Sequence, residues 1–173
     1  MTGWESQRPY WLKCPGYHYP KAKDMPYQDL CRGRVSLPHQ VYHVTICTYQ
    51  RLAWFDDFDT ARLVIREMRR LQDERRLDSL AWVLMPDHLH WMFHVQAGSN
   101  LSVLIKTLKG RVASSTRRRV NRQVPLWQRG FHDRAVRHDE DLTSLARYIV
   151  ANPLRAGLVE RISEYPHWDA VWL

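Results

Sequence analysis

Alternating hydrophobic and polar positions mark three short stretches of the chain, and this period of two predicts β-strands. The stretches are residues 40–49 (QVYHVTICTY), 79–85 (SLAWVLM) and 88–95 (HLHWMFHV). Pro86-Asp87 is a favourable turn between the last two. A fourth strand is predicted over residues 125–136, where Gly130 is a candidate for a bulge.

Three other stretches repeat their hydrophobic residues every three or four positions, which predicts amphipathic helices over residues 58–77, 100–120 and 140–152. The predicted core faces are, in chain order, Val64, Met68 and Leu71; Leu101, Leu104, Ile105, Leu108 and Val112; and Leu142, Leu145 and Ile149. Asp139 is the expected N-cap of the last helix, because its carboxylate can accept hydrogen bonds from the first backbone amides.

The predicted elements follow the order β-α-β-β-α-β and then a further helix. This order is the split β-α-β, ferredoxin-like arrangement of an α+β protein. In this topology the third strand is central in an antiparallel sheet, two helices cover one sheet face, and the other face is left free. Residues 39–160 form the expected domain, after an irregular basic and aromatic N-terminal arm (1–38) and before a C-terminal tail (161–173).

The third predicted strand carries two histidines, His88 and His90, in a run that is otherwise mostly apolar. Alternation predicts two faces: Leu89, Trp91, Phe93 and Val95 beneath the helices, and His88, His90, Met92 and His94 on the opposite side. Two imidazoles one pleat apart can hold a metal ion, although such a pair alone also fits a merely polar sheet face. A nucleotide-hydrolase histidine triad is excluded, since position 92 is methionine.

The chain is strongly basic, with 26 Lys and Arg residues against 18 Asp and Glu residues and a net charge of +8. Most of the basic residues are arginine, whose planar guanidinium fits phosphate and stacks on bases. Eight tryptophans and eight tyrosines add platforms for base stacking. This balance favours nucleic acid as a partner over a basic surface that serves solubility alone.

Tyr148 and Asn152 lie four residues apart on the last predicted helix, so they share a face that differs from its core face. A tyrosine hydroxyl can attack phosphorus, and an amide oxygen can join two imidazoles around a divalent cation. Taken singly, Tyr148 also fits the edge of a core, and Asn152 also fits a cap before Pro153. In combination with the histidine pair and the positive charge, the two residues favour a catalytic site.

The sequence also indicates the cellular compartment of the protein. No stretch approaches the roughly 20 apolar residues of a membrane helix, and the first residues lack the apolar segment of a secretory signal. Cys14, His18 and Cys31 have a spacing that fits no common zinc pattern, and three cysteines form no even disulfide framework. We therefore expect free thiols and a cytoplasmic protein with no membrane partner.

Two separated segments, WVLMPDHLHWMF (82–93) and YIVANPLRAGLV (148–159), resemble the REP-associated tyrosine transposases. These are relatives of the single-tyrosine transposases of the IS200/IS605 group, within the HUH endonuclease superfamily. The similarity continues through YHVTICTYQR (42–51) and LWQRGFHDRAVRHDEDL (126–142) and spans roughly residues 33–160.

The resemblance implies a role for each matching residue. His88 and His90 match the histidine–hydrophobic–histidine motif that binds the catalytic Mg²⁺ or Mn²⁺, and Tyr148 matches the nucleophile. Asn152 lies where relatives place a third, polar metal ligand, which is glutamine in some of them. The candidates for DNA contact, each with a solvated surface as the alternative, are Arg155, Lys106, Lys109, Arg111, Arg117, Arg118 and Arg119.

By resemblance the expected function is a metal-dependent single-stranded DNA endonuclease and strand transferase. It would act at hairpins of repetitive extragenic palindromes (REP) through a covalent 5′-phosphotyrosine, and a monomer is favoured over a dimer. A transposase-derived protein that binds hairpin DNA without cutting it is the alternative of a different class. A relaxase or replication initiator is disfavoured by the short chain and by the lack of a second tyrosine signal.

Overall fold

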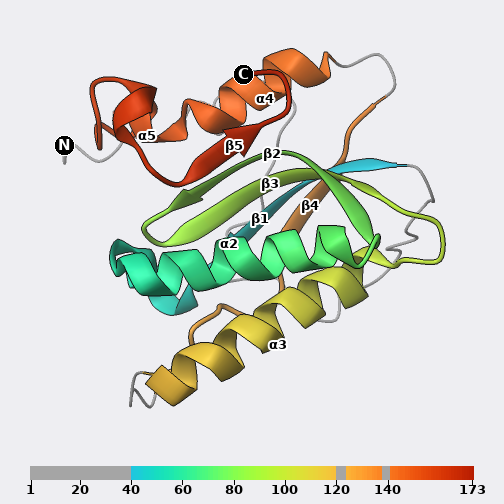
Figure 1. Ribbon diagram of the computed structural model, residues 1–173. Coiled ribbons are helices and arrows are strands. Elements are labelled where there is room, and N and C mark those ends of the chain that lie inside the picture. The colour runs from blue at the N-terminus through green and yellow to red at the C-terminus, as the bar shows by residue number, and fades with distance from the viewer. Residues whose placement is uncertain (1–39, 120–123, 138–140) are drawn as a thin grey trace, which may run out of the picture. The chain divides into compact units, whose positions relative to one another are not determined.

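A single antiparallel sheet organises the described part of the chain. The computed structural model describes residues 40–119, 124–137 and 141–173, which belong to the compact unit of residues 34–173. The sheet order is β4-β1-β3-β2-β5 (Figure 1). The strands are β1 (Val41–Cys47), β2 (Leu77–Met85), β3 (His88–Val95), β4 (His132–Ala135) and β5 (Trp168–Ala170). The ferredoxin-like α+β prediction, with β3 at the centre, is confirmed.

The helices form layers on both sides of this sheet. Helices α2 (Phe58–Asp73) and α3 (Leu101–Arg119) cover one face, and α4 (Leu142–Val150) lies on the other, followed by the short α5 (Asn152–Arg155) (Figure 1). Within the described residues, short 3₁₀ helices span Tyr49–Arg51, Trp54–Asp56 and Ile162–Glu164. Asp57 begins α2 as its N-cap, because its carboxylate accepts a hydrogen bond from the Thr60 amide at 2.8 Å.

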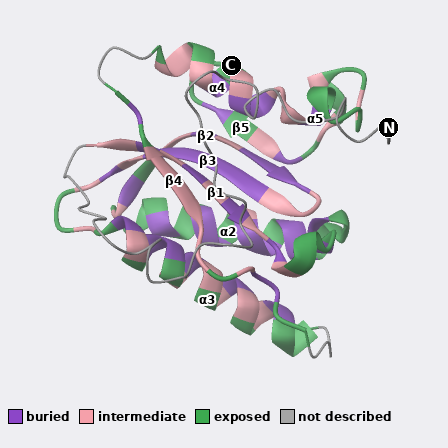
Figure 2. Ribbon diagram, turned by 180° about the vertical axis from the view of Figure 1, so that it is seen from behind, coloured by how far each residue is buried: buried purple, intermediate pink, exposed green. Residues whose placement is uncertain are grey.

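The larger hydrophobic core lies between the sheet and helices α2 and α3. The β3 residues predicted to face the helices are all buried in it, which Figure 2 shows as the purple run along that strand. The predicted helix residues in this core are buried as well: Val64, Met68, Leu71, Leu101, Leu104, Ile105, Leu108 and Val112. The period-of-two and helical patterns therefore identified the two sides of this core correctly.

A smaller hydrophobic cluster lies on the opposite face of the sheet, beneath α4. Ile149 and its helix neighbours Ala146 and Val150 are buried there with Val83 and Met92, and Leu142 and Leu145 pack against the cluster. The prediction that this face is free is therefore wrong. The helix α4 is amphipathic, and its apolar stripe is buried against the apolar side chains Ala81, Val83 and Met85, which β2 presents on this face.

Several element boundaries differ from the prediction; α2, for example, ends at Asp73 rather than at residue 77, where β2 already begins. The strand predicted over 125–136 is shortened to β4 (His132–Ala135), because Gly130 adopts a left-handed φ of 71° that interrupts the extended backbone. Before Gly130, the pairing consists of a single bridge between Trp127 and Thr48. The N-cap of α4 is Asp141, whose carboxylate accepts from the Thr143 amide at 2.9 Å. Asp139, the predicted cap, lies outside the described residues.

The C-terminal tail contributes a strand that the pattern did not predict. The edge strand β5 pairs with β2, with Ala170 opposite Ala81 and Trp168 opposite Val83. Tyr165 adds a hydrogen bond from its hydroxyl to the Leu84 carbonyl at 2.7 Å. The N-terminal arm, with Cys14, His18 and Cys31, lies outside the described residues. In the described ranges, none of the helices has the length and apolar character needed to cross a membrane.

Leu108 provides a test of the larger core. Its side chain is fully buried on α3, so we expect Leu108→Ala to lower the free energy of unfolding by about 2–5 kcal/mol. Val103→Ala is the matched control, since Val103 is 49% exposed on the same helix and should change stability by less than about 0.5 kcal/mol. Urea denaturation followed by circular dichroism measures both. Equal effects of the two substitutions would contradict this packing.

Candidate active site on the central strand

The histidine pair lies on the central strand β3, on the face that α4 partly covers. His90 is opposite Thr45 of β1 in the register, and His88 is opposite Cys47. His90 is only 5% exposed, and His88 is partly buried. The alternation of β3 thus holds both imidazoles on one side of the sheet, as the sequence predicts.

The two imidazoles converge through their Nε2 atoms, which are 3.1 Å apart. Their other ring nitrogens are bound by neighbouring side chains. His88 Nδ1 donates to the Asp87 carboxylate at 2.6 Å, and His90 Nδ1 is hydrogen-bonded to the Thr45 hydroxyl at 3.0 Å. This is the arrangement in which outer partners orient histidine ligands of a metal ion, and it brings the two Nε2 atoms together at one point.

The electrostatic surroundings keep both rings neutral. Burial lowers the pKa of His90 well below its ordinary value, and the positive charges of nearby groups, including Arg155, act in the same direction. Burial also lowers the pKa of His88, although the hydrogen bond to Asp87 opposes this. Neutral imidazole is the form that binds metal ions, so both histidines have the required protonation state at neutral pH.

Asp87 is itself held in place by Arg51. The guanidinium Nε lies 2.7 Å from one carboxylate oxygen of Asp87, while the other oxygen accepts from His88. Burial alone would raise the pKa of Asp87, but the hydrogen bond from His88 and the positive charge of Arg51 leave it lowered. Arg51 reaches this position from a backbone with a left-handed φ of 57°, directly after Gln50 with a φ of 52°. The result is a chain of contacts from Arg51 through Asp87 to His88.

Tyr148 lies on α4, whose apolar stripe packs on the same sheet face as the histidines. Its side chain is partly buried, and its hydroxyl oxygen is buried. The guanidinium carbon of Arg155 lies 4.0 Å from the centre of the tyrosine ring. Arg155 therefore places a positive charge beside Tyr148, and the same charge contributes to the lowered pKa of His90.

Asn152 points its amide toward its own helical segment. Its Nδ2 donates to the Ile149 carbonyl at 2.7 Å, and its Oδ1 accepts from Arg155 at 2.8 Å. Within the described ranges, no group of three or more His, Cys, Asp and Glu side chains is arranged to hold a metal ion. Two imidazole nitrogens are therefore the donors that the fold prepares, and the Asn152 oxygen is engaged with Arg155.

The remaining candidates for DNA contact lie on α3, across the sheet from the histidine pair, and several are engaged there. Arg111 pairs with Glu74 at 2.9 Å, and Arg119 forms an ion pair with Asp59. The exposed members of the set are Lys106, Arg117, Arg118 and the ion-paired Arg119. Of all the predicted basic contacts, only Arg155 lies beside Tyr148.

Lys109 points inward and joins α3 to the segment before β4. Its Nζ donates to the carbonyls of Gln128 at 2.6 Å and Gly130 at 2.8 Å. We expect Lys109→Met to destabilise the protein by about 1–3 kcal/mol, because both carbonyls lose their partner, whereas Lys106→Met on the exposed face should be nearly neutral. Guanidinium denaturation at pH 7 checks both variants.

The same lysine gives this difference in stability a defined pH dependence. Burial lowers the pKa of Lys109 to about 8, whereas an unfolded lysine titrates near ~10.4. Between these values the unfolded chain binds more protons than the folded one, so stability rises with pH. The stability of the wild type relative to Lys109→Met should therefore increase from pH 8 to pH 10. A constant difference would contradict the buried position of the amine.

Sequence reasoning missed the residues that support the histidines. Asp87 directly precedes His88, so its role was accessible as a turn carboxylate next to a candidate ligand. Thr45 and Arg51 gave no such signal, because their positions depend on the β1–β3 register and on the left-handed turn after β1.

Comparison with known proteins identifies the family. The model of the family described as "Transposase IS200 like" matches residues 36–152, which include both histidines and Tyr148. The chain belongs to this family of transposases.

Individual relatives agree with this assignment. The chain is 25% identical over 104 residues to the REP-associated tyrosine transposase of Escherichia coli strain K12, covering 56% of each protein. It is 27% identical over 100 residues to a candidate REP-associated tyrosine transposase of Haemophilus influenzae, covering 52% of this chain and 57% of the relative. The chain thus spans a little over half the length of these curated relatives.

Two solved structures share the fold. A REP-associated tyrosine transposase bound to a REP hairpin matches with a TM-score of 0.63 and 21% identity, over 78% of this chain and 79% of that one. A candidate transposase from Deinococcus radiodurans matches with a TM-score of 0.50 and 21% identity, over 68% of this chain and 94% of that one. At this identity the likeness concerns the fold alone.

Proposed function

We propose that this transposase is a metal-dependent single-stranded DNA endonuclease and strand transferase. Its substrate is DNA at a REP-type hairpin, and the reaction passes through a 5′-phosphotyrosine on Tyr148. The observation that carries the proposal is the convergence of the His88 and His90 Nε2 atoms, 3.1 Å apart, on the sheet face where α4 packs. The hairpin in the related REP-associated transposase structure supports the choice of substrate.

The donor set fits a divalent cation. His88 and His90 would hold Mg²⁺ or Mn²⁺ through Nε2, and Asn152 is the proposed third ligand once its oxygen is released from Arg155. When bound, such an ion supplies Lewis-acid stabilisation of the charge that develops on the phosphate oxygens. Neutral imidazoles leave that positive charge undiminished.

The protein side chains carry the covalent step. The Tyr148 hydroxyl oxygen attacks phosphorus and loses its proton, the bond from phosphorus to the 3′ oxygen breaks, and the leaving strand keeps a 3′-OH. Arg155 places positive charge beside the attacking ring. The phosphotyrosine bond keeps the energy of the phosphodiester, so a second 3′-OH can reverse the step and join strands without ATP.

A denaturing gel tests the proposal directly. Labelled oligonucleotides that carry a hairpin and a single-stranded flank are incubated with the protein and Mg²⁺ or Mn²⁺, or with EDTA. We expect a band that contains both protein and DNA, formed with the metal and lost with EDTA. Protease digestion of that band should leave a peptide containing Tyr148 attached to the 5′ phosphate.

A hairpin-binding protein without cleavage is the second candidate function. The observation that favours it is Asn152, whose amide oxygen accepts from Arg155. Tight hairpin binding with no adduct and no cut product on any oligonucleotide would replace the proposed activity with this one.

A further inference from the structure

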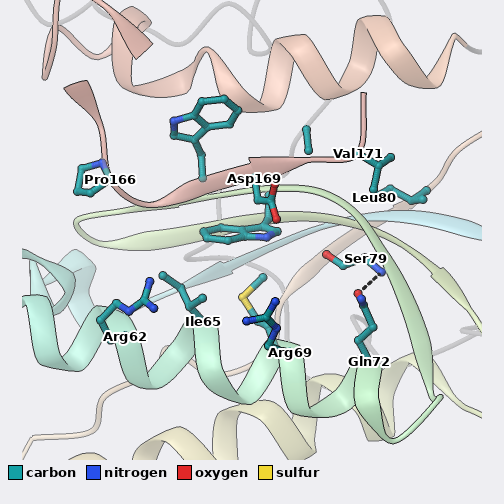
Figure 3. Close-up of a pocket in the computed structure, with 13 residues that line it drawn as sticks. Arg62, Ile65, Arg69, Gln72, Ser79, Leu80, Pro166, Asp169 and Val171 are labelled. Carbon is teal, nitrogen blue, oxygen red and sulfur yellow. Dashed lines mark hydrogen bonds between the residues drawn. The ribbon is translucent and has the colours of Figure 1, made fainter. Parts of the chain in front are cut away.

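A pocket with a volume of about 320 Å³ lies between α2 and the sheet edge formed by β2 and β5 (Figure 3). Its α2 wall is on the side of the sheet opposite to α4, so it is separate from the histidine pair. Arg62 and Arg69 line it from the helix, and Trp82 and Asp169 line it from the strands. The volume falls at the lower end of the ~300–1,000 Å³ range of small-molecule sites.

Trp82 provides an aromatic surface in this pocket. The indole packs against the larger core on one side and remains partly exposed. Its cross-strand partner in the β2–β5 register is Asp169, so the two side chains share the face that looks toward α2. An accessible indole at a pocket wall is a platform on which a planar ring can stack.

Arg62 and Arg69 are two turns apart on α2, and both extend from the helix toward β5 (Figure 3). Among the described residues, neither guanidinium forms an ion pair or a hydrogen bond. This distinguishes them from Arg70, Arg111 and Arg119, each of which pairs with a carboxylate. Two uncommitted guanidinium groups beside an indole form a surface suited to phosphate groups next to a stacked base.

Asp169 adds a hydrogen-bond acceptor on the opposite wall, and Figure 3 shows its carboxylate turned toward α2. A carboxylate accepts from exocyclic amino groups, as in contacts with cytosine N4. At the far end of the pocket, Gln72 is already engaged with the Ser79 amide at 3.0 Å, so it contributes a fixed wall.

We propose that this pocket binds an unpaired cytosine or adenine of a single-stranded segment next to the hairpin. The base stacks on Trp82, its amino group donates to Asp169, and Arg62 and Arg69 contact the adjoining phosphates. This inference rests on the proposed function in that the partner is DNA with a single-stranded flank. It gives the protein a second contact with the strand, on the sheet face opposite to the cleavage site.

Binding measured by fluorescence anisotropy tests the pocket without requiring cleavage. The probes are a blunt hairpin, the same hairpin with a flank of about four deoxycytidines, and a version whose flank is abasic. We expect the wild type to bind the deoxycytidine flank about tenfold more tightly than the abasic one. Trp82→Leu and the double variant Arg62→Gln/Arg69→Gln should bind both probes equally, and Asp169→Asn should lose the preference for cytosine over thymine flanks.

The matched control is Arg66→Gln, which removes an exposed arginine of the same helix that does not line the pocket and should keep the flank effect. Thermal denaturation verifies that each variant is folded. Retention of the flank effect in folded Trp82→Leu and in the double arginine variant would overturn the proposal, as would equal binding of all three probes by the wild type.

Two further outcomes separate the alternatives. Free deoxycytidine monophosphate that competes as strongly as the flanked hairpin would assign the pocket to a free nucleotide and overturn its role in strand binding. A protein that shows the flank effect but forms no adduct would keep the pocket and reject the proposed cleavage. An adduct without any flank effect would keep the cleavage and reject the pocket.

Discussion

Replacing Tyr148 by phenylalanine will abolish the covalent protein–DNA adduct while the fold and hairpin binding remain intact. The substitution removes only the hydroxyl oxygen, which is the proposed nucleophile. The phenylalanine ring still fills the partly buried space on α4 beneath the Arg155 guanidinium. We expect cleavage and adduct formation to fall on the order of 10³-fold or more, as for the loss of other covalent nucleophiles.

A matched control is available in Tyr165, a second partly buried tyrosine. Its hydroxyl donates to the Leu84 carbonyl, and burial raises the pKa of Tyr165 to about 12, so it is a poor nucleophile. Tyr165→Phe should therefore cost some stability and retain the adduct, the reverse of Tyr148→Phe. Quantitative denaturing gels and thermal melts of both variants measure the two effects. An adduct of undiminished yield on Tyr148→Phe would reject Tyr148 as the nucleophile.

The side of the sheet on which the histidines lie could be predicted because it depends only on local pattern. Alternation along β3 buries Trp91 and Phe93 toward the helices and turns His88 and His90 the other way. The apolar stripe of α4, with Ile149 at its centre, was equally visible at helical spacing. The sequence therefore predicted which face of β3 carries the histidines and which face of α4 packs on the sheet.

The contacts that complete the site could not be predicted, because they depend on tertiary geometry. Thr45 meets His90 only through the β1–β3 register, and Arg51 reaches Asp87 only from a left-handed turn. The inward direction of Lys109 likewise depends on where the segment before β4 passes α3. Strand β5 is three residues long, too short for alternation to give a signal.

His90→Gln will remove the binding of Mn²⁺, because it deletes one of the two nitrogen donors that converge at the site. Glutamine keeps a polar side chain opposite Thr45, so the β1–β3 pairing should persist. The wild-type imidazole is neutral at pH 7, since burial lowers the pKa of His90 well below its ordinary value, and its Nε2 lone pair is available to the ion. We expect the affinity for Mn²⁺, measured by isothermal titration calorimetry, to fall by more than about tenfold, and His88→Gln should act similarly.

His94 supplies the control for this experiment within the same strand. It lies on the same face of β3 but beyond Met92, and its Nδ1 is 3.5 Å from Asp78. If the site is the convergent Nε2 pair, His94→Gln should bind Mn²⁺ as the wild type does, while both variants of the pair lose it. Equal losses in all three would indicate diffuse attraction of the ion to the strand face, and equal retention would place the ion elsewhere. Because calorimetry measures metal binding directly, neither result depends on a cleavable DNA substrate.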